Sequence, residues 1–298
     1  MESFLSIFHY KSELVNLIEE DSTFTKYFCE INKDLWSIDD KESNTNLYTN
    51  LMKEILKSNN INIFKDIKAL IEFLLLALHD ELKTDNNGKK MTKKPNLHKN
   101  NYEINEDFFS ENTSYIKKLF FIDIEFERNC RNCHTSIFNI SERCTLVFDL
   151  EKIILQNLKQ IDIKNILDCT IENEGDYYKC KCNNQFKSNV KFYQLPKYLI
   201  IIIKRKENED IKFLIGKSFN INIKKYMSRN ATNIETHYEL VSLIQNNNNT
   251  ICKSNTENEW YKFDGKHVMK NINNKKYIIK DTISIPYLLI YQNKYKKI

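Results

Sequence analysis

Four of the eight cysteines stand in two tight pairs, and these pairs constrain the fold more than any other feature of the sequence. Cys130 and Cys133 form a Cys-x-x-Cys pair, and Cys180 and Cys182 form a Cys-x-Cys pair that begins 47 positions after Cys133. Zinc takes four tetrahedral ligands at about 2.3 Å from each sulfur, and two close pairs on neighbouring turns supply them. The pairs predict a structural zinc that ties together a long two-stranded projection with little core of its own. The alternative is that these thiols bind no metal. If zinc does bind, four sulfur ligands leave no open coordination position for catalysis, so the site is structural.

The composition narrows the class of protein. Glycine (4) and proline (3) are too scarce for a disordered or fibrous chain, and 41% hydrophobic residues suit a globular one. The net charge is +5, but the lysines are interleaved with acidic residues and form no basic stripe, so we expect no specific nucleic-acid partner. Paired cysteines suit metal binding in a reducing compartment, so we expect an intracellular protein of the cytoplasm or nucleus.

No segment predicts membrane insertion or export. Met1–Leu5 has no basic stretch followed by an apolar one, so a secretory signal is not expected. The apolar runs Leu70–Leu78 and Leu199–Ile203 fall short of the roughly 20 residues that a spanning helix needs. We therefore expect a soluble protein, without a membrane partner, that is a monomer.

Three regions differ in their pattern of apolar residues. Residues 1–83 predict helices, the clearest from about Phe64 to Leu82 and a shorter one within Phe4–Leu17. Residues 84–104 have few apolar side chains and predict a linker or exposed loop. Residues 105–298 are rich in strand patterns, at Phe120–Phe126, Cys144–Phe148, Tyr198–Lys204, Tyr238–Gln245, Trp260–Asp264 and Tyr287–Tyr291. Helices followed by strands predict an α+β fold, and we expect a single domain over residues 1–298.

The order of these segments resembles the ubiquitin-specific protease family, the cysteine proteases that cleave ubiquitin from its conjugates. Ile116–Phe120 before the first cysteine pair and Tyr178–Cys182 around the second are similar to the family's two zinc knuckles. Leu195–Ile200, which ends in Lys204-Arg205, resembles a family strand, although Lys206 replaces a Phe. Weaker matches follow in the family's order at Glu72–Leu74, Tyr238–Ile244, Trp260–Asp264 and Tyr287–Tyr291. Together these motifs cover nearly the whole chain.

The resemblance implies a hand-shaped, cysteine-protease-like fold. It would have a helical thumb in residues 1–83 and zinc-ribbon β fingers with knuckles at 130–133 and 180–182. An antiparallel β palm would complete the hand. In the family the palm holds the body of ubiquitin, and the ubiquitin tail runs between thumb and palm. Ubiquitin or a ubiquitinated protein is therefore the expected partner, and structural zinc is the expected cofactor.

The family's catalytic residues are not all present at the matching positions. The family's Gly-Asn-Thr-Cys segment would fall before Met1, so the sequence as written contains no counterpart of the nucleophile. Counting back from Trp260 places Asn247 where the family has its histidine, to within about a residue. An amide takes up no proton near neutral pH, so Asn247 is not a base. Asp264 keeps the position of the residue that orients the histidine.

Other residues are poor replacements for the missing pair. The six histidines are interpreted as surface or structurally satisfied residues, with His237 at the far end of its strand and His267 on the opposite face from Asp264. Cys29 and Cys252 have no evident base beside them and are interpreted as packing residues.

Three functions remain open. The first is a catalytically inactive member of the family that still binds ubiquitin or acts as a scaffold. The second is an active thiol-dependent deubiquitinase with its cysteine segment upstream and its base from an unexpected position. The third is a zinc-containing adaptor in an RNA-processing complex without ubiquitin binding, as the resemblance to inactive relatives implies. Whether the chain is an enzyme is therefore left open by the sequence.

Overall fold

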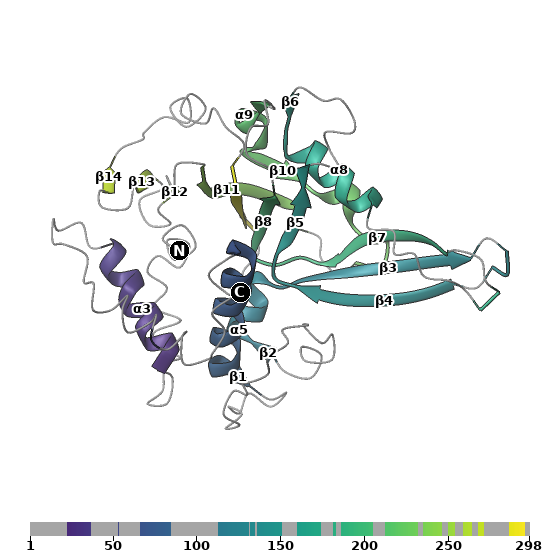
Figure 1. Cartoon of the computed structure of the whole chain (residues 1–298), viewed down its shortest axis with the longest axis horizontal. Coiled ribbons are helices and arrows are strands. Elements are labelled where there is room, and N and C mark those ends of the chain that lie inside the picture. The colour runs from purple at the N-terminus through teal and green to yellow at the C-terminus, as the bar shows by residue number, and fades with distance from the viewer. Residues whose placement is uncertain are drawn as a thin grey trace. The chain divides into compact units, whose positions relative to one another are not determined.

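The computed structural model describes fifteen parts of the chain: residues 23–36, 53, 66–84, 113–130, 132–134, 136–150, 160–173, 181–182, 186–204, 212–231, 235–245, 250–253, 259–263, 268–270 and 286–295. The chain divides into two compact units (Figure 1). The first comprises Met1–Leu119 and Val241–Lys280, and the second comprises Phe120–Leu240 and Asp281–Ile298. Among the described residues, no helix has the length and apolarity needed to cross a membrane.

Two helices, α3 (Thr23–Trp36) and α5 (Ile67–Leu82), pack together in the first unit. Asp66 caps α5 by accepting a hydrogen bond from the Lys68 amide, which explains why the helix begins slightly later than the predicted Phe64. Of the apolar residues that repeat at helical spacing, Ile67 and Leu70 are half-buried, whereas Ile71, Leu74, Ala77 and Leu78 are buried. The buried face is wider than this stripe and also includes Phe73, Leu75, His79 and Leu82. The helix predicted within Phe4–Leu17 lies outside the described residues.

A short hairpin-like pairing follows α5. Strand β1 (Lys83–Thr84) pairs antiparallel with β2 (Thr113–Ser114), and helix α6 (Tyr115–Phe120) begins directly after β2. Residues 85–112, which contain most of the predicted loop, lie outside the described part. Phe120 was predicted to start a strand, but it ends α6, because a buried apolar run without periodicity does not distinguish a helix from a strand.

The remainder of the first unit is an antiparallel sheet. Its order is β14 (Val268–Lys270), β13 (Trp260–Phe263), β12 (Thr250–Lys253) and the second half of β11 (His237–Ile244). The strands predicted from Tyr238 and Trp260 are confirmed, each with boundaries shifted by a residue.

The second unit contains a deeply buried strand, β8 (Tyr198–Lys204), whose first six residues are at most 1% exposed. This strand has the predicted boundaries. It pairs antiparallel with β15 (Leu288–Asn293) and parallel with β5 (Leu146–Asp149). Strand β10 (Asn220–Asn222) pairs with the first half of β11. The sheet is thus antiparallel, as predicted, except at the β5–β8 pair.

A separate three-stranded antiparallel sheet in the second unit has the order β4–β3–β7. Its strands are β3 (Ile122–Cys130), β4 (Ser136–Arg143) and β7 (Phe186–Gln194), drawn as the long ribbon in Figure 1. The register is continuous along β3 and β4 from Ile122 opposite Arg143 to Asn129 opposite Ser136. The sheet therefore carries the end of β3 away from the larger sheet and delivers Cys130 at its tip.

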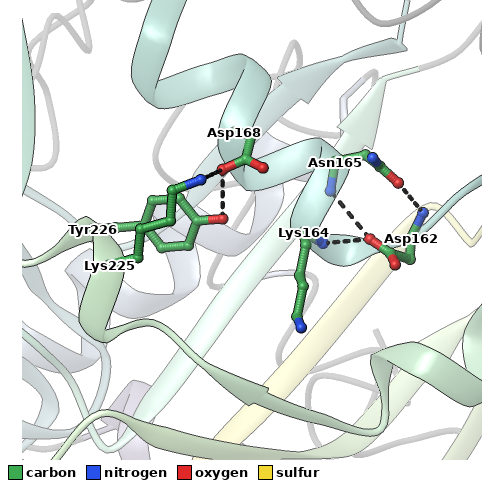
Figure 2. Close-up of polar contacts among 6 residues, drawn as sticks. All are labelled: Asp162, Lys164, Asn165, Asp168, Lys225 and Tyr226. Atoms are coloured by element: carbon green, nitrogen blue, oxygen red, sulfur yellow. Dashed lines mark hydrogen bonds and ion pairs between the residues drawn. The ribbon is translucent and has the colours of Figure 1, made fainter.

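Helix α8 (Ile163–Asn173) was not predicted in the strand-rich half of the sequence. Figure 2 shows what fixes its start: the Asp162 carboxylate accepts from the amides of Lys164 and Asn165, and the Asn165 side chain accepts from the Asp162 amide. One turn later, Asp168 accepts hydrogen bonds from Lys225 Nζ and the Tyr226 hydroxyl at 2.7 and 2.8 Å (Figure 2). These contacts join α8 to the 3₁₀ turn η3 (Lys224–Tyr226).

Small elements complete the second unit next to α8. Strand β6 (Gln160–Ile161) pairs parallel with β9 (Lys212–Phe213), and helix α9 (Ile215–Ser218) follows β9. Ser218 accepts a hydrogen bond from the Ile163 amide, so α9 also supports the start of α8.

Candidate metal centre and the predicted catalytic positions

Three of the four predicted zinc ligands meet at the tip of the β4–β3–β7 sheet. Cys130 is the last residue of β3, Cys133 follows in a turn, and Cys182 precedes β7. Their sulfur atoms all lie within 4.8 Å of one another, and the sulfurs of Cys130 and Cys182 are 3.4 Å apart. Cys180 lies outside the described residues. Cys130 and Cys182, which are 52 positions apart, are therefore close in space, as the paired spacing predicts.

The first cysteine pair sits in a tight turn that explains this convergence. The His134 amide donates to the Cys130 carbonyl at 3.0 Å, which folds the chain back on itself. His134 has φ of 56°, the left-handed region that residues with a Cβ rarely occupy. Nothing in the sequence signals this strain, since glycine would be the usual choice at such a position.

The donor set and its spacing fit zinc. Four sulfurs in a tetrahedron about 2.3 Å from a zinc ion are about 3.8 Å apart, which lies between the two limits seen here. Thiolates are soft ligands that favour zinc over magnesium or calcium. Cys130 is buried, Cys182 is half-buried and Cys133 is exposed, so the cluster lies at the surface of the protein.

The predicted catalytic positions border a row of strand ends in the first unit. In the β11–β12–β13 sheet, Ile244 lies opposite Thr250, and Thr250 lies opposite Phe263. Asn247 belongs to the connection between β11 and β12, and Asp264 follows β13 directly; both residues lie outside the described part of the chain. The last residue of β11, the first of β12 and the last of β13 therefore lie side by side at one end of the sheet.

The described histidines do not lie in this row. His237 begins β11, at the end opposite Ile244, and its Nε2 lies 2.9 Å from the side-chain nitrogen of Asn222. His79 is fully buried, and its Nδ1 lies 2.6 Å from the Ser114 hydroxyl oxygen. Burial, with Lys83 and Lys117 nearby, lowers the pKa of His79 to about 4. It is therefore neutral at pH 7 and is bonded to Ser114 through Nδ1.

The two cysteines considered as substitute nucleophiles have the character of packing residues. Cys252 is 1% exposed and packs against Tyr261 on the neighbouring strand. Burial, together with the adjacent Glu30, raises the pKa of the Cys29 thiol to about 11. Cys29 is therefore protonated at neutral pH, and a protonated thiol is a weak nucleophile.

The comparisons with known proteins establish the family. The sequence model of the ubiquitin carboxyl-terminal hydrolase family matches residues 2–291. The chain belongs to this family. A search of curated proteins found no match.

Solved structures with a similar fold are those of a deubiquitinating (DUB) module. A chain of the SAGA DUB module of Ubp8, Sgf11, Sus1 and Sgf73 bound to monoubiquitin aligns over 100% of this chain and 67% of its own, with 17% identity and a TM-score of 0.66. A chain of the same four-protein module bound to ubiquitin aldehyde aligns over 100% of this chain and 68% of its own, with 18% identity and a TM-score of 0.64. A chain of the Ubp8-Sgf11-Sgf73-Sus1 module aligns over 98% of this chain and 64% of its own, with 16% identity and a TM-score of 0.63.

These matches confirm the mixed helix-and-sheet fold that the resemblance implied. At 16–18% identity they carry the fold alone, and the chain spans about two thirds of the length of the chains it matches. The assignment of residues 1–83 as a thumb and of the cysteine knuckles as zinc-ribbon fingers remains a prediction.

Proposed function

We propose that this chain is a deubiquitinase-like domain that binds ubiquitin without cleaving it. The observation that carries the proposal is the absence of a histidine from the sequence between β11 and β12. Residues 245–249 read Gln-Asn-Asn-Asn-Asn, and Asn247 stands at the family's histidine position. The proposal rests on this replacement alone, because a thiol nucleophile needs a base to take its proton wherever that thiol comes from.

The loss of the base removes both proton transfers of the step that cleaves the isopeptide bond. In a cysteine protease the imidazole deprotonates the thiol and then protonates the departing amine. An asparagine side chain does neither, because its amide is neutral across the physiological range. Asp264 would orient a ring that is not there. The described histidines His79 and His237 are already engaged elsewhere, through the contacts with Ser114 and Asn222.

Binding has different requirements. Stable protein–protein contact is spread over roughly 800 Å² on each partner, so the exchange of one side chain need not abolish it. Chains of the same fold occur in structures bound to monoubiquitin and to ubiquitin aldehyde. This fold likeness supports ubiquitin as the ligand of this chain.

We further propose that Cys130, Cys133, Cys180 and Cys182 hold a structural zinc. The described sulfurs have the spacing that zinc requires, and four thiolates would complete its coordination shell. Such an ion stabilises the sheet and supplies no catalytic step. We also propose the reducing interior of the cell as the place of action, because paired cysteines that bind a metal suit a reducing compartment.

The first experiment uses the full chain and two forms of ubiquitin. Plain ubiquitin is titrated by calorimetry, and ubiquitin with a thiol-reactive C-terminal group is incubated with the protein and analysed by intact mass. We expect saturable binding and no covalent adduct. An adduct at a single cysteine would show an active thiol and refute the inactive assignment. Binding that never saturates, with zinc retained, would favour the adaptor function instead.

A substitution separates loss of the base from loss of the binding surface. Asn247→His restores an imidazole at the family's position, and Asn249→His is the matched control in the same asparagine run. Both variants should bind ubiquitin as the wild type does. If Asn247→His weakened ubiquitin binding tenfold and Asn249→His did not, position 247 would belong to the binding surface, contrary to the proposal.

A further inference from the structure

Strand β4 forms an exposed edge of the three-stranded sheet. Among the described residues it pairs with β3 alone, and Figure 1 shows it along the outer side of the ribbon. Its first five residues, Ser136–Ile140, are all exposed. Three of them are large hydrophobic residues: Ile137 (40% exposed), Phe138 (59%) and Ile140 (49%).

This edge lacks the features that usually prevent strand pairing. Natural edge strands carry lysine, proline or a bulge that discourages another strand from pairing with them. Ser136–Ser141 contains no charged residue and no proline, and its register with β3 has no bulge. Only one other large hydrophobic residue of the described part, Tyr295, is comparably exposed. Apolar side chains gathered on a free strand edge mark a protein–protein contact.

We propose that β4 pairs antiparallel with β4 of a second copy of this chain, joining the two three-stranded sheets into one. A strand edge can pair with its own copy across a two-fold axis that is perpendicular to the sheet. Such an axis makes the two strands antiparallel, and a side chain lies on the same face of the joined sheet in both copies. This geometry pairs residues of equal parity, so Phe138 and Ile140 face each other across the axis.

One register gives the best pairing of side chains. With the axis at Asn139, Phe138 of each copy lies opposite Ile140 of the other, and Ile137 lies opposite Ser141. The interface then contains two aromatic–aliphatic pairs on one face. A shift that places Phe138 opposite itself would leave Ile140 opposite Ser136. Cross-strand apolar pairs stabilise a sheet by roughly 0.2–1 kcal/mol each, which favours the first register.

The charges on the face of the proposed contact permit the pairing. Glu142, near the end of β4 itself, shares this face and in the favoured register lies opposite the uncharged Ser136 of the other copy. Glu125 lies opposite Ile140 and Glu127 lies opposite Phe138 within one copy, so both carboxylates share the face of the proposed contact. The β3 strands of two paired copies would be three strand spacings apart, about 14 Å. This exceeds the Debye length of about 8–10 Å at physiological salt, so repulsion between the two sets of carboxylates is screened.

The contact is small, which sets its strength. The paired strand edges cover much less than the roughly 800 Å² per partner of a stable complex. The dimer should therefore be weak and dissociate on dilution. The proposal differs from the monomer expected from the sequence.

Sedimentation velocity of the full chain over a range of concentrations tests the proposal. We expect the weight-average mass to rise from that of one chain, 35.7 kDa, towards twice that value. Two double variants, Phe138→Lys with Ile140→Lys and Phe138→Glu with Ile140→Glu, should each stay monomeric, because like charges would then oppose each other. An equal mixture of the two variants should associate again.

Controls exclude misfolding and general hydrophobic association. Circular dichroism should show that the double variants fold, since both positions are exposed. Tyr295→Lys removes the other exposed hydrophobic residue and should leave the association unchanged. A wild type that stays monomeric, an association that persists in both double variants, or a mixture that fails to associate would each refute the proposed pairing.

Discussion

At the scale of single residues, His79 couples the stability of the first unit to pH. It is buried in α5, and its pKa is lowered from 6.5 to about 4. Because the folded state disfavours the proton, the stabilisation is complete above pH 6.5 and is lost as the pH falls from 6.5 towards 4. A shift of this size corresponds to about 3 kcal/mol at the acid end. We predict that the free energy of unfolding decreases by roughly this amount over that pH range through His79.

The contribution of His79 is measured as a difference between variants. Urea unfolding of the wild type and His79→Gln at a series of pH values should show a steep acid loss of stability in the wild type only. The control is His237→Gln at an exposed strand residue, which leaves His79 intact and should keep the steep profile. Parallel pH profiles for wild type and His79→Gln would show that burial of this ring does not govern acid stability.

The pairing of His79 with Ser114 also shows what sequence reasoning misses at this scale. The two residues are 35 positions apart, and no spacing or periodicity connects them. His79 was interpreted as a surface or satisfied histidine, and the structure shows it buried, with Nδ1 in contact with Ser114. The sequence analysis made no prediction for Phe138, an exposed aromatic residue in a strand that no local pattern indicated.

At the scale of elements, Glu81 of α5 caps the start of α3. Its carboxylate accepts from the amides of Phe24 and Thr25 at 3.0 and 2.8 Å and from the Thr25 hydroxyl at 2.7 Å. The first amides of a helix have no partner within the helix, so a carboxylate there satisfies them and interacts favourably with the helix dipole. We predict that Glu81→Ala destabilises the protein by about 1–2 kcal/mol.

A matched variant on the same helix separates this cap from an ordinary surface charge. Glu72 forms an ion pair with Lys68 one turn away, at 3.7 Å. Such a pair contributes about 0.3–0.5 kcal/mol, so Glu72→Ala should cost only a few tenths. Denaturant unfolding of both variants tests the difference. Equal effects would mean that the three hydrogen bonds of Glu81 add nothing beyond its charge.

The three-stranded sheet should depend on the metal at its tip. We predict about one zinc ion per chain, lost on Cys182→Ser and retained on Cys29→Ser, whose thiol lies outside the cluster. Since the metal would hold β3 and β7 together at Cys130 and Phe186, its removal should speed amide exchange there first. Zinc content and hydrogen exchange are the measurements. Zinc-free protein with unchanged exchange at the tip would contradict a structural ion.

Sequence reasoning succeeded for elements with a strong local pattern and failed where distant contacts decide. The boundaries of β8 were predicted because its apolar run is continuous, and α5 because its stripe repeats at helical spacing. Helix α8 buries Ile163, Ile166 and Leu167, and its cap at Asp162 and the hydrogen bonds of Asp168 with η3 are visible only in three dimensions. The cysteine cluster was found because the members of each pair are close in sequence.

At the scale of the whole molecule, ubiquitin should stabilise the protein if it binds the folded state alone. A ligand at about 100 times its dissociation constant adds about 2.7 kcal/mol to the free energy of unfolding. For a chain of this size each kcal/mol raises the melting temperature by about 2–4 °C, so we predict a rise of several degrees that saturates with ubiquitin concentration. Because a chain of two compact units need not melt in one step, the transition of each unit is followed separately by calorimetry.

Asn247→His should show the same rise as wild type, because the exchange restores a base and leaves the binding surface in place. An unrelated small protein at equal concentration gives the baseline, and a melting temperature that ubiquitin leaves at this baseline would exclude ubiquitin as the ligand.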